Sequence, residues 1–330
     1  MQQIDFCPVG RMQHQLLVRA SNWIGDCVMS VAALRELRRL HPETHITLAG
    51  CGWVTDLFEG QAFVDRVITL DQRAYWSRIR AERVALRGSD SVLLFPNSFS
   101  SALSPFLARV PVRLGYQTDG RSFLLTGRAR PRARQLGLHQ AFYYLDLIHQ
   151  LGLSETDYLT HQDFVPDITL EAPVAGVQEA SRLLEKMGVD RTRPLVILNP
   201  GAAFGPAKRW FLDRYAAVAD LLVSQEGAEI LVVGSAREQP LAEQLLAHMN
   251  GKAHSLSGRT TLATLMGLLT WCDLLLTNDS GPMHLAAAMQ KEVVALFGPT
   301  DPNRYGPWGQ LHNVLAAPDA DLGNLPTEQV

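Results

Sequence analysis

The sequence predicts an α/β protein made of two Rossmann-like domains that face one another across a cleft. Short apolar segments of strand length alternate with helical segments along nearly the whole chain, as in parallel sheets with right-handed crossovers. This alternation fades between about residues 152 and 172 and then restarts. A chain of 330 residues is long enough for two domains. We therefore expect one domain at 1–165 and a second at 166–330.

The first half begins its alternation at residues 16–20, a buried type of strand with the sequence Leu-Leu-Val-Arg-Ala. Residues 27–40 follow with apolar positions at helical spacing. The other expected strands are 45–49, 66–70, 91–95 and 112–115, and the other expected helices are 54–58, 72–86, 101–108 and 139–151. Residues 121–134 are expected to form an arginine-rich loop.

The second half repeats the pattern from residue 176 onward. The expected strands are 195–198, 229–233, 253–256, 273–276 and 293–297, and the expected helices are 176–187, 211–223, 238–249, 262–269 and 283–289. The last residues, 316–330, are polar, and we expect them to contain no more than a short helix.

Composition indicates a soluble protein of the cytoplasm. Hydrophobic residues make up 47% of the chain and charged residues 19%, which is typical of globular proteins. No apolar run approaches the ~18 residues of a membrane span, and no basic segment followed by an apolar core suggests a signal peptide. The four cysteines are scattered, which argues against a zinc site or a disulfide framework.

Charge differs between the two halves. Residues 1–150 contain 18 arginines and 12 acidic residues, a net charge of +6, whereas residues 151–330 contain 12 basic and 21 acidic residues, a net charge of −9. A basic half indicates an anionic partner such as a phosphorylated lipid, a nucleic acid or a membrane surface. A solvated arginine-rich surface is the alternative. No nucleic-acid recognition module is present, so we expect no nucleic-acid partner.

The segment 277–284, Thr-Asn-Asp-Ser-Gly-Pro-Met-His, connects an expected strand to an expected helix. Ligands bind at such junctions in open α/β sheets, and a helix N-terminus attracts anions. Asp279 and Ser280 are candidate N-cap residues, and the N–H groups up to Gly281 could hold a phosphate. The alternative is a capping turn without a ligand. His284 lies one turn into the helix, where it either reaches the same pocket or packs in the core.

The segment 199–210, Asn-Pro-Gly-Ala-Ala-Phe-Gly-Pro-Ala-Lys-Arg-Trp, follows a buried strand in the same half. Gly201 and Gly205 allow close approach of a ligand to the backbone, and Lys208 can place a point charge on a phosphate. The P-loop pattern GxxxxGK[ST] is absent. The alternative is an ordinary turn with a surface lysine. Because both loops follow strands of one half, together they favour a diphosphate ligand.

Asp26 follows the first strand at the start of a helix, where a carboxylate could act as a general base toward an incoming hydroxyl. An ordinary N-cap aspartate is the alternative. In the arginine-rich loop, guanidinium groups could bind a phosphorylated acceptor or lipid headgroups, or could simply be solvated. These arginines are residues 121, 128, 130, 132 and 134.

Together these motifs resemble glycosyltransferase family 9, the ADP-heptose:lipopolysaccharide heptosyltransferases, whose two-domain fold is called GT-B. The motifs that carry the resemblance are RASNWIGD at 19–26, FPNSF at 95–99, GYQTDGR at 115–121, the 199–210 loop, TNDSG at 277–281 and FGPT at 297–300. NWIGD, LFPNS and FGPAKRW are more similar to heptosyltransferases of type II than of type I. The chain departs from the family pattern after residues 306–312, where many relatives carry a cysteine-containing segment.

The resemblance implies that the second domain binds ADP-L-glycero-D-manno-heptose and the first binds the heptosylated inner core of lipid A. It implies that Asp26 is the catalytic base and that Lys208 contacts the donor diphosphate. It assigns donor binding to Gly201, Lys208, Glu238, Ser257, Asp279, Ser280, Gly281 and His284, and acceptor binding to Arg19, Asn22, Asn97 and Arg121. The reaction would need no cofactor and no metal. We expect no stable protein partner and a cytoplasmic location, peripheral at the inner face of the cytoplasmic membrane.

Two kinds of alternative stay open. The same motifs and architecture could serve a heptosyltransferase of type I, another family 9 transferase or a nucleotide-sugar epimerase. They could also belong to a sugar-nucleotide-binding paralogue without turnover, although the presence of both Asp26 and Lys208 argues against it.

Overall fold

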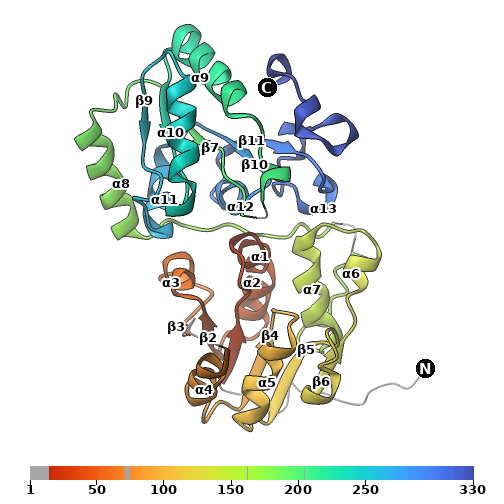
Figure 1. Cartoon of the computed structure of the whole chain (residues 1–330). Helices are drawn as coiled ribbons and strands as arrows, with labels where there is room; N and C mark the ends of the chain where they lie inside the picture. The colour runs from red at the N-terminus through yellow and green to blue at the C-terminus, as the bar shows by residue number, and fades with distance from the viewer. Residues whose placement is uncertain (1–14, 71–74, 162, 204) are drawn as a thin grey trace. The chain divides into compact units, whose positions relative to one another are not determined.

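The chain forms two α/β units, each built on one six-stranded parallel sheet (Figure 1). This computed structural model describes residues 15–70, 75–161, 163–203 and 205–330. The first compact unit ends at Ile168, and the second begins at Thr169. We call them the N-unit and the C-unit. The predicted α/β architecture with two Rossmann-like sheets is confirmed.

The sheet of the N-unit has the strand order β3-β2-β1-β4-β5-β6. Its strands are β1 (Gln15–Arg19), β2 (His45–Gly50), β3 (Arg66–Thr69), β4 (Ser91–Leu94), β5 (Val112–Tyr116) and β6 (Gly127–Ala129). Its helices are α1 (Ile24–Met29), α2 (Val31–Leu40), α3 (Gly52–Phe58), α4 (Tyr75–Ala85), α5 (Phe99–Leu107), α6 (Arg132–Gln135) and α7 (Gln140–Gln150).

The sheet of the C-unit has the strand order β12-β11-β10-β7-β8-β9. Its strands are β7 (Leu195–Asn199), β8 (Glu229–Val232), β9 (Ala253–Ser255), β10 (Leu274–Asn278), β11 (Glu292–Phe297) and β12 (Val314–Ala316). Its α-helices are α8 (Val174–Met187), α9 (Leu212–Glu226), α10 (Gln239–His248), α11 (Leu262–Trp271), α12 (Gly281–Ala288) and α13 (Pro302–Tyr305).

Both sheets share one topology, because strands counted within each unit run in the order 3-2-1-4-5-6. The order reverses between β1 and β4 in the N-unit and between β7 and β10 in the C-unit. At such a reversal the loops after the two neighbouring strands diverge, which opens a crevice at their carboxyl ends. Arg19 pairs with Leu94 at the first reversal, and Asn199 pairs with Thr277 at the second. The topology thus predicts one ligand site in each unit.

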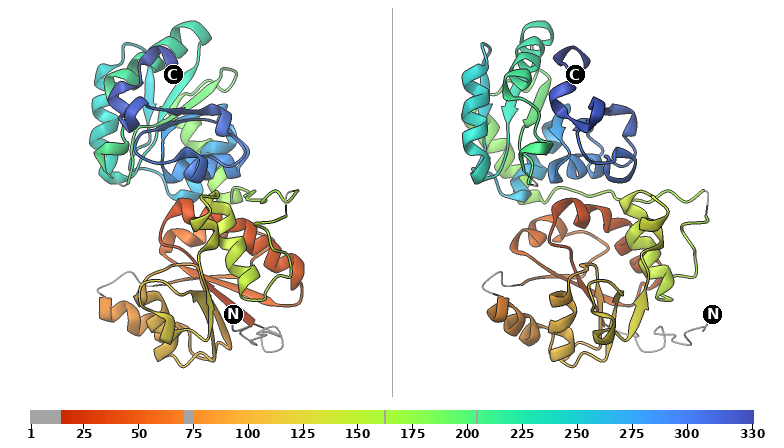
Figure 2. Two further views of the ribbon diagram at one scale, coloured as in Figure 1. Left: turned by 90° about the vertical axis from the view of Figure 1, so that its right-hand side faces the viewer. Right: turned by 45° about the vertical axis from the view of Figure 1, so that its right-hand side comes forward.

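Helices pack against the sheet in each unit, as Figure 2 shows from two further directions. Apolar side chains of the sheet and of these helices form the core of each unit. In the N-unit, Leu17, Val92 and Leu94 pack against Ala102 of α5 and Leu86 after α4. In the C-unit, β7, β8, β10 and β11 share one cluster with α9, α10 and the C-terminal segment. Among the described residues, no helix is both long enough and apolar enough to cross a membrane.

The structure corrects the expected elements at three places. The helix expected at 27–40 is two helices, α1 and α2, and it starts earlier, at Ile24. The arginine-rich stretch expected as a loop contains β6 and α6. The C-terminal stretch holds β12 and three 3-10 helices, Pro318–Ala320, Leu322–Asn324 and Thr327–Gln329. The first residues of the helix expected at 72–86 lie outside the described residues.

Candidate active site

Asp26 lies in the first turn of α1, just after β1, at the crevice of the N-unit. The N-cap of α1 is Trp23, so the alternative that Asp26 is an N-cap residue is wrong. Its Oδ1 accepts hydrogen bonds from Gln140 Nε2 at 3.1 Å and from Tyr144 OH at 3.2 Å. Both donors belong to α7 and are neutral. Within the described residues, no cation pairs with this carboxylate.

Burial raises the pKa of Asp26 above its ordinary value, and the hydrogen bonds from Tyr144 and Gln140 offset part of that shift. A carboxylate with a raised pKa takes up a proton more readily than an exposed aspartate does. Its Oδ2 accepts no hydrogen bond from the residues that the structure describes. Asp26 therefore has the environment expected of a general base.

Asn97 follows β4 on the other side of the same crevice. Its Nδ2 donates to Tyr143 OH at 2.7 Å, and Thr118 Oγ1 donates to its backbone oxygen at 3.2 Å. Tyr143 and Tyr144 are neighbours on α7, so this helix orients the polar groups after both strands. Their rings also pack against each other, with centroids 5.3 Å apart.

Arg121 is fully buried and supports the loop that carries Asn97. Its Nε donates to Tyr116 O at 2.9 Å, and its Nη1 donates to Pro96 O at 2.5 Å and to Ser101 Oγ at 2.8 Å. Burial lowers the pKa of this guanidinium to about 10. Arg121 thus lies under the loop that carries Asn97, with its charge directed at backbone oxygens.

Arg19 is also buried, at the carboxyl end of β1. Its Nη2 lies 3.4 Å from Glu82 Oε1 of α4 and 3.3 Å from Asn22 Oδ1. Ser104 Oγ donates to the other carboxylate oxygen of Glu82 at 2.7 Å. Arg19 therefore ties the loop that contains the exposed Asn22 to a buried ion pair. A contact of Arg19 or Asn22 with the acceptor stays a prediction.

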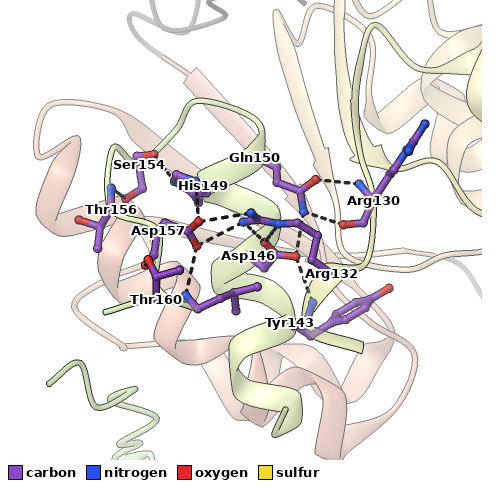
Figure 3. A network of polar contacts seen from close by, with 12 residues as sticks. Arg130, Arg132, Tyr143, Asp146, His149, Gln150, Ser154, Thr156, Asp157 and Thr160 are labelled. Atoms are coloured by element: carbon purple, nitrogen blue, oxygen red, sulfur yellow. Dashed lines mark hydrogen bonds and ion pairs between the residues drawn. The ribbon is translucent and has the colours of Figure 1, made fainter. Parts of the chain in front are cut away.

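A second polar network fixes α7 itself (Figure 3). Arg132 donates to buried Asp146 Oδ1 at 2.6 Å and lies 3.3 Å from Asp157 Oδ1. Gln150 Nε2 donates to Asp146 Oδ2 at 2.8 Å and to Arg130 O at 2.6 Å. Arg132 of the arginine-rich stretch thus forms ion pairs within the N-unit and anchors the helix that carries Tyr143 and Tyr144.

In the C-unit, Asn278 at the end of β10 joins the two loops that the sequence singled out. Its Nδ2 donates to Pro200 O at 2.8 Å, and its Oδ1 accepts from Trp210 N at 3.1 Å and from Tyr215 OH at 3.2 Å. Because Pro200 and Trp210 lie at the two ends of the 199–210 loop, this one amide holds that loop beside the N-terminus of α12.

Lys208 and Asp279 form an ion pair across these loops, with Nζ 2.5 Å from Oδ2. Thr300 Oγ1 donates to the same carboxylate oxygen at 2.6 Å. The alternative that Lys208 is an ordinary surface lysine is therefore wrong. Asp279 fixes the position of the lysine and balances its charge. Thr300 belongs to the FGPT motif, for which sequence analysis had assigned no role.

The N-terminus of α12 keeps its N–H groups unoccupied by side chains of the described residues. Ser280 is the N-cap residue, but its hydroxyl makes no capping bond. Instead, Ser280 Oγ accepts from Asn199 Nδ2 at 3.0 Å and lies 3.0 Å from Thr277 Oγ1. The N–H of Gly281 is thus left without a capping side chain and is available to an anion, whereas Pro282, the next residue, has no N–H.

There is no room for a side chain at Gly201, because Glu238 lies directly beside it. A Cβ atom on Gly201 would lie 2.0 Å from Glu238 Oε1. The other carboxylate oxygen of Glu238 accepts from Ser235 N at 2.8 Å in a capping box. Gly234 lies between Glu238 and Ser257, and Ser257 Oγ is buried without a hydrogen-bond partner among the described residues. These residues follow β7, β8 and β9, so they share one edge of the sheet.

His284 lies in α12 and is buried. This burial agrees with the packing alternative and leaves a contact with a ligand as a prediction. The C-unit therefore places a cation, an uncapped helix N-terminus and a carboxylate at neighbouring strand ends. The N-unit places a carboxylate with a raised pKa at the equivalent strand ends. The first set suits a diphosphate, and the second suits proton removal from a hydroxyl.

Comparison with known protein families decides the family. The model of glycosyltransferase family 9 (heptosyltransferase) matches residues 79–325. The chain belongs to glycosyltransferase family 9. It is thus a glycosyltransferase, and the family resemblance predicted from the motifs is confirmed.

Relatives of this family 9 enzyme match over most of their length. Lipopolysaccharide heptosyltransferase 2 of Salmonella typhimurium is 30% identical over 91% of this chain and 87% of the relative. Lipooligosaccharide heptosyltransferase 2 of Haemophilus influenzae is 28% identical over 93% of this chain and 90% of the relative. The solved structure of E. coli ADP-heptose LPS heptosyltransferase II is 26% identical, covers 96% of both chains and gives a TM-score of 0.80.

Sequence reasoning missed the residues that orient the candidate catalytic groups. These are Gln140, Tyr143 and Tyr144 in the N-unit and Asn199, Asn278 and Thr300 in the C-unit. A buried tyrosine hydroxyl needs a polar partner, so two adjacent tyrosines on a core helix were a usable signal. Which group each hydroxyl meets depends on contacts between residues 46 positions apart for Tyr143 and 118 positions apart for Tyr144, and one sequence does not contain that information.

Proposed function

We propose that this family 9 enzyme transfers L-glycero-D-manno-heptose from ADP-heptose to the heptosylated inner core of lipid A, as a heptosyltransferase of type II. The names of the relatives support the donor and the acceptor class, because each of the two cited sequence relatives is a heptosyltransferase 2. The geometry supports the chemistry. Its main support is that two equivalent strand-end sites carry complementary groups, Asp26 in the N-unit and Lys208 with the α12 N-terminus in the C-unit.

On the acceptor side, Asp26 would take the proton of the acceptor hydroxyl as that oxygen attacks C1 of the donor heptose. Attack from the face opposite ADP inverts the anomeric centre. The raised pKa of Asp26 supports this role, and the neutral donors Gln140 and Tyr144 hold the carboxylate without neutralising it. Asn97, Asn22 and the arginine-rich N-unit suit a polar, anionic acceptor.

On the donor side, negative charge grows on the ADP diphosphate as the C1–oxygen bond breaks. Lys208 and the N–H groups at Ser280 and Gly281 would stabilise that charge. Groups fixed in place before the reaction stabilise developing charge without a reorganisation cost. Asp279 and Thr300 supply this fixation for the lysine. Glu238 and Ser257 would contact the adenosine part, next to the close approach allowed by Gly201.

We propose a cytoplasmic location, peripheral at the inner face of the cytoplasmic membrane, where a lipid-linked acceptor would be found. The enzyme would act without a stable protein partner and without nucleic acid. The excess of arginine in the first half of the chain supports contact with an anionic lipid.

The decisive test is transfer from ADP-heptose to purified lipid A cores that carry no heptose, one heptose or two, read by mass spectrometry. We expect the mass of one heptose to be added to the one-heptose core alone. Transfer to the heptose-free core would instead indicate type I. Tight binding of ADP-heptose without any transfer would indicate a non-catalytic paralogue.

A further inference from the structure

The outward face of α4 combines arginines with exposed apolar side chains. Trp76 is 72% exposed and Val84 is 60% exposed, and Arg80 and Arg83 are exposed between them. Residues 76, 80, 83 and 84 are spaced by i, i+4, i+7 and i+8, which places them on one face of the helix. Exposed Arg87 continues the stripe in the turn after α4.

Glu82, the one acidic residue of α4, lies on the opposite, buried face of the helix. Ile79 and Glu82 point inward and are buried, as is Leu86 just after the helix. Glu82 is only 4% exposed and is paired with Arg19. Within the described residues, Arg80, Arg83 and Arg87 form no ion pair. The exposed face of α4 is therefore positive, with no acidic residue of the helix to neutralise it.

The stripe continues onto the end of α5, which packs beside α4 (Figure 1). Arg83 lines a shallow pocket of about 460 Å³ together with Phe106, Leu107, Arg109 and Arg113. Phe106 is 42% exposed and Leu107 is 38% exposed, so apolar and cationic groups again lie side by side. We call Trp76, Arg80, Arg83, Val84, Arg87, Phe106, Leu107 and Arg109 the α4–α5 surface.

The composition of the α4–α5 surface fits a lipid bilayer better than a second copy of the chain. Aromatic and aliphatic side chains partition into the interfacial layer of a bilayer, while arginines contact anionic headgroups. A two-fold contact between two copies would bring arginines of one surface toward the same arginines of the other, because each such interface uses one patch twice. Like charges held close together oppose such a contact.

We propose that the α4–α5 surface docks the enzyme onto an anionic lipid bilayer. This inference rests on the peripheral location in the proposed function and assigns that location to named residues. Arg80, Arg83, Arg87 and Arg109 supply the attraction to headgroups, and Trp76, Val84, Phe106 and Leu107 supply shallow insertion. The catalytic residues of the N-unit lie at the carboxyl ends of β1 and β4 and are not part of this surface.

The test is sedimentation of the full chain with vesicles of phosphatidylcholine alone or mixed with phosphatidylglycerol. We expect binding to the mixed vesicles, weakened by added salt because counter-ions screen the arginines. R80Q/R83Q should weaken this binding about 30-fold, since each arginine near an anionic surface contributes roughly a fivefold gain. The matched control is R182Q/K186Q, which removes the same charge at two exposed positions of α8.

Tryptophan fluorescence gives an independent readout. Mixed vesicles should shift the emission of the wild-type enzyme to shorter wavelength, and Trp76→Ser should abolish most of that shift. Thermal unfolding of each variant checks that the fold is kept. Equal vesicle binding by R80Q/R83Q and by R182Q/K186Q would overturn the proposal, as would an absence of binding to mixed vesicles. Loss of a self-associated form in R80Q/R83Q without any vesicle binding would assign the surface to a second copy and also overturn it.

Transfer assays separate this inference from the proposed function. R80Q/R83Q should keep wild-type kcat and KM with a deacylated, water-soluble core, and should raise KM with the core embedded in mixed vesicles. A KM that stays unchanged with the embedded core would count against docking through this surface. Vesicle binding by an enzyme that transfers heptose to no core would refute the proposed function and leave the docking surface intact.

Discussion

The N-unit and the C-unit use one topology for opposite electrostatic purposes. In each, the strand order reverses beside the first strand, and the candidate residues follow the two strands at that reversal. In the N-unit this edge holds Asp26, an anion with neutral hydrogen-bond donors and a raised pKa. In the C-unit the corresponding edge holds Lys208 and an uncapped helix N-terminus, which attract an anion.

This contrast teaches that the fold decides where a ligand binds and the loop residues decide what it is. A strand order of 3-2-1-4-5-6 opens a crevice in both units, but only the sequence after each strand gives that crevice a charge. The same logic separates two cations. An ion pair with Asp279 holds Lys208 at the crevice of the C-unit. The guanidinium of Arg121 instead donates hydrogen bonds to the backbone oxygens of Tyr116 and Pro96. Four predictions test these assignments, in order of expected effect.

Replacing Asp26 should have the largest effect. Asp26→Asn removes the general base and should lower kcat by about 10²–10⁴-fold. Because burial raises the pKa of Asp26 in the folded state, folding binds protons between the unfolded and folded pKa values. Stability therefore falls as pH rises through that window, and the ionised group destabilises the fold at neutral pH. Asp26→Asn should thus raise the free energy of unfolding at pH 7 while abolishing most activity.

Rates come from single-turnover heptose transfer, and stability comes from urea unfolding. Asp90→Asn is the matched control, because Asp90 is an exposed aspartate of the same unit. It should leave both quantities near wild type. Near-wild-type turnover of Asp26→Asn would refute the base assignment.

Arg121→Met should mainly lower stability. It removes the guanidinium donor from the backbone oxygens of Tyr116 and Pro96, and Pro96 O keeps only the 3.4 Å hydrogen bond from Ser101 Oγ. Each buried group left unsatisfied costs about 1–3 kcal/mol. We expect a loss of about 2–5 kcal/mol in the free energy of unfolding. Arg128→Met, at an exposed position of β6, is the control and should change it little. If Arg121 instead contacts the acceptor, its replacement will raise the acceptor KM without a change in stability.

Lys208→Met should weaken ADP binding by about 10–100-fold, the range for losing a hydrogen bond to a charged group. Isothermal titration calorimetry with ADP measures this directly. Lys252→Met, at an exposed lysine of the same unit, should leave the affinity unchanged.

A double variant shows whether Lys208 acts through its partner. If Lys208 serves only to neutralise Asp279, then Lys208→Met/Asp279→Asn should recover wild-type ADP affinity. If the lysine contacts the diphosphate, the double variant should bind ADP as weakly as Lys208→Met does. With Asp279→Asn also measured alone, the three affinities relative to wild type give the coupling energy of the pair.

Much of this architecture follows from local sequence, because alternating apolar segments specify parallel strands without long-range information. The ends of β1, β7 and β10 could be located, and with them Asp26, Lys208 and Asp279. The strand β6 was missed, because its three residues, Gly-Arg-Ala, contain no apolar run and lie in an arginine-rich stretch.

The burial of Arg121 and the ion pairing of Arg132 were also not predictable from the sequence. Clustered arginines suggest a solvated surface. Only the fold shows that Arg132 donates to Asp146 and that Arg121 donates to the backbone oxygens of Tyr116 and Pro96. A partner that follows an arginine by fourteen residues, or lies on another strand, leaves no local pattern.

The smallest predicted effect tests the finest distinction in the N-unit, between the two adjacent tyrosines of α7. Tyr144 OH donates to Asp26, and this bond lowers the pKa of the carboxylate. Tyr144→Phe should therefore raise that pKa further and move the acidic limb of the kcat/KM profile to higher pH. At neutral pH we expect a loss of about two- to tenfold, the usual value of one hydrogen bond. Tyr143→Phe removes a hydroxyl that contacts Asn97 instead, so its acidic limb should stay in place. Equal shifts in both variants would mean that α7 acts on Asp26 through packing, and the assignment of Asp26 as a base tuned by Tyr144 would then be wrong.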